Sequence, residues 1–158
     1  MASAETLRHF CPVLRQGFLL ALLLAAAAAD IRKKRIPNRL LLAALAGRVL
    51  LGLLELSCGI LGTVPELVGI WLDSMLLTAA FFLLSMLFRK ALGMGDVKLM
   101  GILALFLGAG EACRCFYRGL LTAAAVSLTL LAGKRIRIEE GIAFAPFLLA
   151  GYLLGGFL

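Results

Sequence analysis

Six long apolar runs, separated by short loops, take up nearly all of the 158 residues of the chain. The second and third runs exceed the ~20 residues that an α-helix needs to cross a bilayer. The fourth run has only 11 residues, so it needs flanking residues such as Met94 or Val97 to reach across. The runs leave no room for a separate soluble domain, so we expect one membrane-embedded domain over residues 1–158. They cover residues 13–29, 40–61, 64–88, 99–109, 116–132 and 141–158.

Composition favours a helical membrane bundle over a soluble protein or a β-barrel. Hydrophobic residues make up 63% of the chain and the mean hydropathy is +1.05, whereas ordinary domains are roughly 45–50% apolar. A barrel would need alternating strands of about ten residues, but these runs are apolar on all sides. Helices satisfy their own backbone hydrogen bonds within lipid. The sequence therefore predicts an all-α, polytopic membrane protein, a bundle of about six transmembrane helices with short loops.

The basic residues are distributed unevenly between the two sides of this bundle. Eleven Lys and Arg residues lie in the loops after the first, third and fifth runs, and four lie on the other side. Because positively charged loops stay in the cytoplasm, we expect these loops inside the cell and both termini outside, in the plasma or inner membrane. The basic stretches are short and lack interleaved aromatic residues, so they favour anionic lipid headgroups over nucleic acid as partners. A basic segment directly after the first run also argues against a cleavable signal peptide.

Two aspartates lie at the expected cytoplasmic edge, each within an unusual short motif. Asp30 opens the stretch Asp-Ile-Arg-Lys-Lys-Arg-Ile-Pro-Asn, and Asp96 lies in Gly-Met-Gly-Asp-Val-Lys. A carboxylate beside hydrocarbon is costly, so two of them at one boundary indicate a function.

The residues around the aspartates are suited to shaping two loops. Gly93 and Gly95 allow another segment to approach the backbone closely. Pro37 fixes the end of the first loop, and we expect Asn38 to cap the helix that follows.

Two facing acids can divide the work of peptide hydrolysis. They cannot both ionise cheaply, so one keeps a proton while the other acts as a base towards water. This chemistry needs no metal and no cofactor. The expected topology puts Asp30 at a helix C-terminus and Asp96 at a helix N-terminus. Because the helix dipole favours an anion at its N-terminus, we expect Asp96 to be the ionised base and Asp30 to carry the proton.

The remaining polar groups favour structural roles. Asp73, within the third run, is a candidate proton relay, although a packing contact or an outward-facing position is the simpler interpretation. We expect Arg48 to extend its charge to the membrane surface and Glu55 to lie near the outer edge. The four cysteines show no paired C-x-x-C spacing, which argues against a zinc site. The single histidine, His9, falls on the side opposite the aspartates, which argues against a histidine-assisted nucleophile.

At these motifs the chain resembles the peptidase domain of the type IV prepilin peptidases, relatives of the preflagellin peptidases and of the G-x-G-D intramembrane aspartyl proteases. Residues 30–38 match D-x-R-x-x-x-I-P-N, and residues 93–98 match G-x-G-D-x-K, in both cases completely. Residues 143–147, Ala-Phe-Ala-Pro-Phe, resemble the family's C-terminal P-F-G-P-F, with alanines in place of its first proline and its glycine.

The resemblance implies a membrane aspartic endopeptidase that removes a short basic leader from prepilin-like precursors, such as Flp pilins or pseudopilins, at the cytoplasmic face. It implies no cofactor. The paired C-x-x-C ligands of the N-terminal methyltransferase domain found in bifunctional members are not present, so a peptidase-only chain is expected. Asp30 and Asp96 would be the catalytic pair, and the active-site loops would contain Arg32, Pro37, Asn38, Gly93, Gly95 and Lys98.

Two functions without proteolysis stay open at this point. A small proton-coupled transporter would use Asp30, Asp73 and Asp96 as relay groups at different depths. A structural subunit of a secretion or pilus assembly would use the motifs only to shape loops. Assembly of several copies of the chain is compatible with either function and with the protease.

Overall fold

In a computed structural model, the chain is helical through most of the part that is described, residues 2–33, 36–57, 64–87, 93–132 and 143–156. Six helices and no strand occur within these residues, which confirms the all-α fold. The helices are α1 (Ala2–Lys33), α2 (Asn38–Ser57), α3 (Val64–Leu87), α4 (Met94–Leu107), α5 (Ala109–Ala132) and α6 (Ala145–Gly156).

Four of these helices are long and apolar enough to cross a membrane. They are α2, α3, α5 and the Cys11–Arg32 part of α1. The other two are shorter, with 14 residues in α4 and 12 in α6, or about 21 and 18 Å at ~1.5 Å per residue. The hydrocarbon core of a bilayer measures ~30 Å. The fourth and sixth apolar runs therefore form helices that are shorter than the bilayer core.

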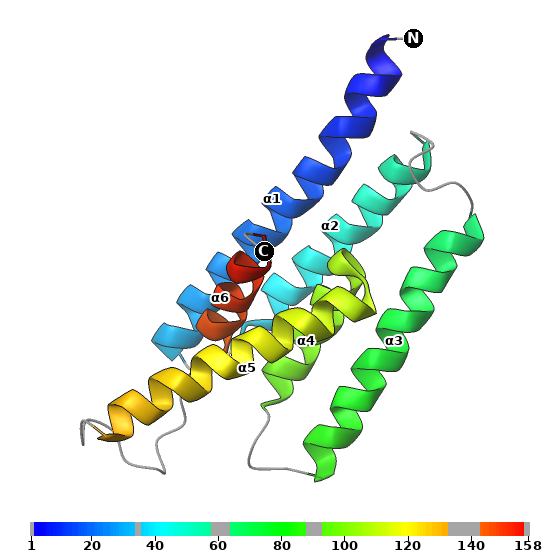
Figure 1. The fold of residues 1–158 in the computed structure, drawn as a ribbon. Coiled ribbons are helices and arrows are strands. Elements are labelled where there is room, and N and C mark those ends of the chain that lie inside the picture. Colours follow the sequence, from blue (N-terminus) through cyan, green and yellow to red (C-terminus); the bar gives the residue numbers. More distant parts are fainter. Residues whose placement is uncertain (1, 34–35, 58–63, 88–92, 133–142, 157–158) are drawn as a thin grey trace.

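The short helix α4 is the centre of the bundle (Figure 1). It contacts α1, α2, α3 and α5, and every residue from Leu99 to Phe106 is buried. A helix that is apolar all round belongs inside a protein rather than at its edge. By contrast, α3 buries only Ser74, Phe81 and Ser85, so most of its surface faces outward.

Gly108 alone separates α4 from α5, and its backbone conformation requires a glycine at this position. Its φ angle is 85°, a region that L-residues with a side chain rarely adopt. Its N–H donates to the Ala104 carbonyl oxygen at 2.8 Å, which satisfies one of the free carbonyls at the end of α4. Because α5 begins directly after this turn, the fifth helix starts seven residues earlier than residue 116, where its apolar run begins.

Small residues bring α5 and α6 into close contact. A Cβ atom added at Gly151 would lie 2.5 Å from the Cys115 carbonyl oxygen and 2.7 Å from the Gly119 nitrogen. Lipid offers no hydrophobic drive for helix association, so van der Waals contacts between closely packed backbones supply much of the association energy. Substituting a larger residue at Gly151 would force the two helices apart.

Arg48 and Glu55 are both buried within the bundle, so the prediction that Arg48 extends its charge to the membrane surface is wrong. Arg48 is 1% exposed and Glu55 is 2% exposed. The Arg48 Nη1 atom lies 3.1 Å from Glu55 Oε2, and its Nε donates to the Leu105 carbonyl oxygen at 2.6 Å. Arg15 adds a second cation, 3.5 Å from Glu55 Oε1. Arg48 stays inside because a carboxylate and a free carbonyl at the end of α4 accept hydrogen bonds from its Nη1 and Nε atoms, which offsets part of the cost of burying its charge.

Candidate active site

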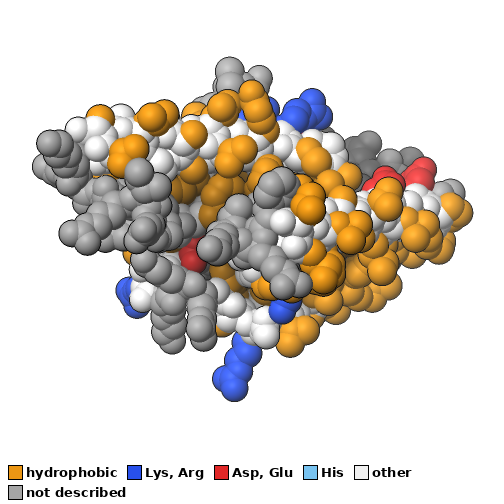
Figure 2. Space-filling model, turned by 90° about the horizontal axis from the view of Figure 1, so that it is seen from below, with side chains coloured by type: hydrophobic (Ala, Val, Ile, Leu, Met, Phe, Trp, Pro, Cys, Tyr) orange, Lys and Arg blue, Asp and Glu red, His pale blue; other side chains and the backbone are white. Residues whose placement is uncertain are grey.

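Both aspartate motifs line one cleft at the same end of the bundle. Its volume is about 340 Å³. Here α1 and α3 end and α4 begins, on the lower side of Figure 1. Figure 2 views this end from below, with Lys and Arg side chains at its edge and hydrophobic side chains over the flanking helices. The residues lining the cleft are Asp30, Ile36, Asn38, Gly93, Met94, Gly95, Asp96 and Lys98.

Asp30 lies in the last turn of α1 and is only 7% exposed. The backbone N–H of Ala145 donates to its Oδ2 at 3.1 Å. Ala145 is the first residue of α6, and the N–H groups of a first helical turn have no partner within the helix. The carboxylate satisfies one of them and meets the positive end of the α6 dipole.

Asp96 lies in the first turn of α4, outside the four candidate membrane spans. Its pKa is raised to about 6, first by burial and then by the negative charge of Asp30, while the backbone N–H of Gly93 partly offsets the rise. This charge interaction shows that the two carboxyl groups sense each other across the cleft. A shift of this kind, from burial plus a like charge, is typical of functional acids.

Which of the two acids carries the proton stays a prediction. Burial and the negative charge of Asp30 raise the pKa of Asp96, so Asp96 keeps its proton up to a higher pH than an ordinary aspartate, whereas the dipole of α4 favours its ionised form. Asp30 accepts an N–H donor from the first turn of α6, so a helix N-terminus faces each of the two acids.

A hydrogen bond joins the two motifs on the rim of the cleft. Lys98 Nζ donates to Asn38 Oδ1 at 3.2 Å. Asn38 therefore links the motifs instead of capping α2 as expected, and the first turn of α2 uses the Pro37 carbonyl, which accepts from the Leu40 N–H at 3.0 Å.

The two glycines of the second motif differ in how much they matter sterically. A Cβ atom at Gly93 would lie 3.2 Å from Asp96 Oδ2, so any side chain there would crowd the acid. At Gly95 the nearest atoms belong to Ile36, at 3.6 Å, which is ordinary contact. The close approach expected of both glycines is therefore found at Gly93 and only loosely at Gly95.

Two of the predicted site residues are not among those that line the cleft. Arg32 is exposed and Pro37 is exposed, and neither lines the cleft as described. Conversely, sequence reasoning missed the backbone N–H of Ala145 as a partner of Asp30. The signal for it was the third motif, residues 143–147, whose role the sequence left undefined.

Neither a metal site nor a relay through Asp73 emerges from the described part of the chain. No group of three or more His, Cys, Asp and Glu side chains lies close enough there to hold a metal ion. Asp73 is exposed on α3 and lines none of the described cavities, so none of these cavities joins it to Asp30 and Asp96.

Comparison with known protein families matches residues 17–158 to the type IV leader peptidase family. The match extends from the middle of α1 to the last residue and includes all three motifs. It confirms the resemblance drawn from the motifs. No curated protein and no solved structure matches the chain.

Proposed function

Because the chain belongs to the type IV leader peptidase family, a family of proteases, we propose that it is a membrane aspartic endopeptidase. Its substrates would be type IV prepilin-like precursors, such as Flp pilins or pseudopilins. It would remove their short basic leader at the cytoplasmic face of the cell membrane, with Asp30 and Asp96 as the catalytic pair.

The single observation that carries the proposal is the shared cleft. Two acids from helices far apart in the sequence line one cavity of about 340 Å³, and the charge on one raises the pKa of the other. Two carboxyl groups that share one site and resist joint ionisation are the working pair of aspartic proteases. A loop-shaping role alone would not need either acid to be buried.

The geometry supports a division of labour between the two acids. Asp30, as the carboxylate, takes a proton from water, and the resulting hydroxide attacks the scissile carbonyl carbon. Asp96 gives its proton to the carbonyl oxygen, so the tetrahedral intermediate forms without a net charge change. When the C–N bond breaks, the proton on Asp30 passes to the leaving nitrogen, and the diol proton returns to Asp96.

Charge placement supports the cytoplasmic face. In the sequence, eleven Lys and Arg residues follow the first, third and fifth apolar runs, next to both aspartate motifs, and positively charged segments at the ends of membrane spans remain in the cytoplasm. A leader cut at this face would itself be on the cytoplasmic side. The basic residues would also attract anionic lipid headgroups around the cleft.

Incubation of the purified protein in detergent with a Flp-type prepilin precursor tests the function. We expect one cut at the leader junction, read by mass spectrometry, and no cut by Asp96→Asn. Proton flux through reconstituted vesicles without any cleavage would instead support the transporter. If the protein shows neither cleavage nor proton flux, the result would favour a structural subunit.

A further inference from the structure

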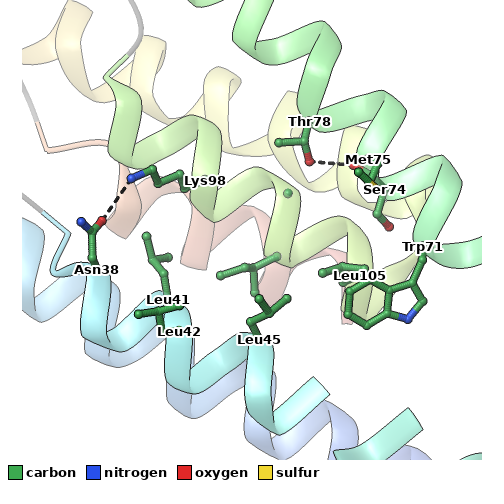
Figure 3. A pocket seen from close by; sticks show the side chains of 12 residues that line it. Asn38, Leu41, Leu42, Leu45, Trp71, Ser74, Met75, Thr78, Lys98 and Leu105 are labelled. Carbon is green, nitrogen blue, oxygen red and sulfur yellow. Dashed lines mark hydrogen bonds between the residues drawn. The ribbon is translucent and has the colours of Figure 1, made fainter. Parts of the chain in front are cut away.

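A second and larger cavity, of about 590 Å³, opens between α2 and α3 (Figure 3). Leu42 and Leu45 form the α2 side, Trp71 and Met75 form the α3 side, and α4 supplies the floor at Gly101. The size falls within the range of ordinary ligand pockets, ~300–1,000 Å³. We call this cavity the apolar groove.

The apolar groove exists because α2 and α3 diverge. α2 packs mainly on α1 and α4, and α3 packs mainly on α4 and α5, with no comparable contact between α2 and α3 in the described residues. Figure 1 shows these two helices standing apart with α4 between them. An occupant could therefore enter from the side, out of the membrane.

The two hydroxyl groups in the apolar groove are already engaged within α3. Ser74 Oγ donates to the Ile70 carbonyl oxygen at 2.7 Å, and Thr78 Oγ1 donates to the Ser74 carbonyl oxygen at 2.6 Å. The walls therefore offer an occupant little hydrogen bonding. A peptide bound here must satisfy its own backbone, which in an apolar setting means a helix.

The apolar groove leads to the aspartate cleft. Its lining extends along α2 from Asn38 to Leu45 and along α4 from Lys98 to Leu105. Each stretch is about seven residues or ~10 Å long, which is two turns of a helix. Asn38 and Lys98 line both cavities. A helix lying in the apolar groove would thus have one end at the rim of the cleft that holds Asp30 and Asp96.

We propose that the apolar groove holds an apolar helical segment of the precursor next to its leader, and so aligns the scissile bond with the two aspartates. This inference rests on the proposed function. The first turn of a docked helix has free N–H groups, and Asn38 Oδ1 offers an acceptor at the rim. The leader then extends beyond the helix end into the cleft. A lipid acyl chain fits the same walls but has no reason to end at the catalytic cleft.

A matched pair of α3 variants tests the apolar groove kinetically. Met75 lines it and is 67% exposed, whereas Leu76 is 73% exposed and faces away from it. We expect Met75→Trp, which fills the space, to lower kcat/KM for a Flp-type prepilin precursor by about tenfold or more. Leu76→Trp should change it less than about twofold, because its new ring meets only lipid.

Two photocrosslinking variants on α2 test the same groove by direct capture of its occupant. p-Benzoylphenylalanine is placed at Leu42, which lines the apolar groove, or at Leu50, which is equally exposed but does not. We expect the precursor to crosslink from position 42 and not from position 50. A phospholipid adduct at position 42 that excess precursor fails to displace would overturn the proposal.

Different results would contradict the groove assignment and the proposed function. If wild-type protein cleaves the precursor but Met75→Trp cleaves it equally well and position 42 captures no precursor, the groove assignment alone is wrong. If wild-type protein cleaves no prepilin precursor, the proposed function is wrong, and the groove assignment falls with it.

Discussion

The bundle buries charge in two places, and the two places are built in opposite ways. In one, Arg48 and Arg15 surround Glu55, and the Leu105 carbonyl oxygen accepts a hydrogen bond from Arg48 Nε. In the other, Asp30 and Asp96 share a cleft, and neither forms an ion pair among the residues described. Buried charges of opposite sign stabilise each other, whereas two acids together raise the cost of ionising both.

The difference separates a structural site from a reactive one. The buried Arg48 and Glu55 charges are paired with each other, with Arg15 and with the Leu105 carbonyl oxygen. In the aspartate cleft, burial and the negative charge of Asp30 raise the pKa of Asp96 to about 6, so this carboxyl group exchanges its proton near neutral pH. Removing a charge should therefore damage folding in the first place and catalysis in the second.

The largest effect should follow loss of either acid. We expect Asp30→Asn and Asp96→Asn each to lower leader cleavage by at least ~10³-fold, since each removes a proton-transfer partner. The melting temperature in detergent should not fall for Asp96→Asn, because its like-charge repulsion is relieved. Asp73→Asn is the matched control on an exposed site of α3 and should cleave normally. Wild-type cleavage by Asp96→Asn would contradict a catalytic role.

A large effect on stability is expected at the other end of the bundle. Arg48→Met leaves Glu55 buried with a single, longer contact to Arg15, which should lower the free energy of unfolding by about 3–5 kcal/mol. Arg114→Met is the control, because its 2.7 Å pair with Glu111 is exposed and worth at most about 1 kcal/mol. Denaturant titration in micelles measures both. Equal losses for the two variants would remove the distinction between the two sites.

The pH dependence should be confined to the aspartate cleft. The folded-state pKa of Asp96 lies above its ordinary value of 3.8, at about 6, so the folded protein holds this proton more tightly than the unfolded chain. Unfolding free energy should therefore fall as the pH rises from about 4 to about 6 and level off above. Asp96→Asn should lose this change.

Activity should follow the same proton. If Asp96 donates it, kcat/KM decreases as the pH rises through about 6, and the pair titrates as a unit. A bound precursor buries Asp96 further, so the corresponding decrease in kcat should occur at higher pH. An activity that increases through pH 6 would restore Asp96 as the base, as helix polarity alone suggested.

The smallest effect is expected at the link between the motifs. Asn38→Ala and Lys98→Met each remove the 3.2 Å hydrogen bond on the rim of the cleft, and each should lower kcat/KM by roughly 3- to 10-fold. The double variant should be no worse than either single one, because both remove the same contact. Additive losses would mean that the two side chains act on the precursor separately.

The sequence predicted the helices and the meeting of the two motifs because both follow from strong local signals. Long apolar runs become helices in lipid, and the alternation of basic loops brings residues 30 and 96 to one end. It did not predict that α6 would direct the Ala145 N–H at Asp30, since a backbone donor has no side-chain signature. It also misplaced Arg48, because the burial of this side chain depends on its contacts with Glu55 and with the end of α4.

The apolar groove was equally invisible in the sequence. Leu42, Met75 and Trp71 are apolar residues among many others, and only the divergence of α2 from α3 makes them one surface. Packing between helices, rather than the pattern within each helix, determines such cavities.

Cleavage of one prepilin precursor by four proteins tests most directly whether the two acids act as a pair: wild type, Asp30→Asn, Asp96→Asn and the double variant. We expect each single variant to lose almost all activity and the double variant to be no worse than either, because removal of one partner already disables a unit. A double variant whose loss is the product of the two single losses would show that the acids work independently, and substantial cleavage by any of the three variants would show that the cleft is not the site of hydrolysis.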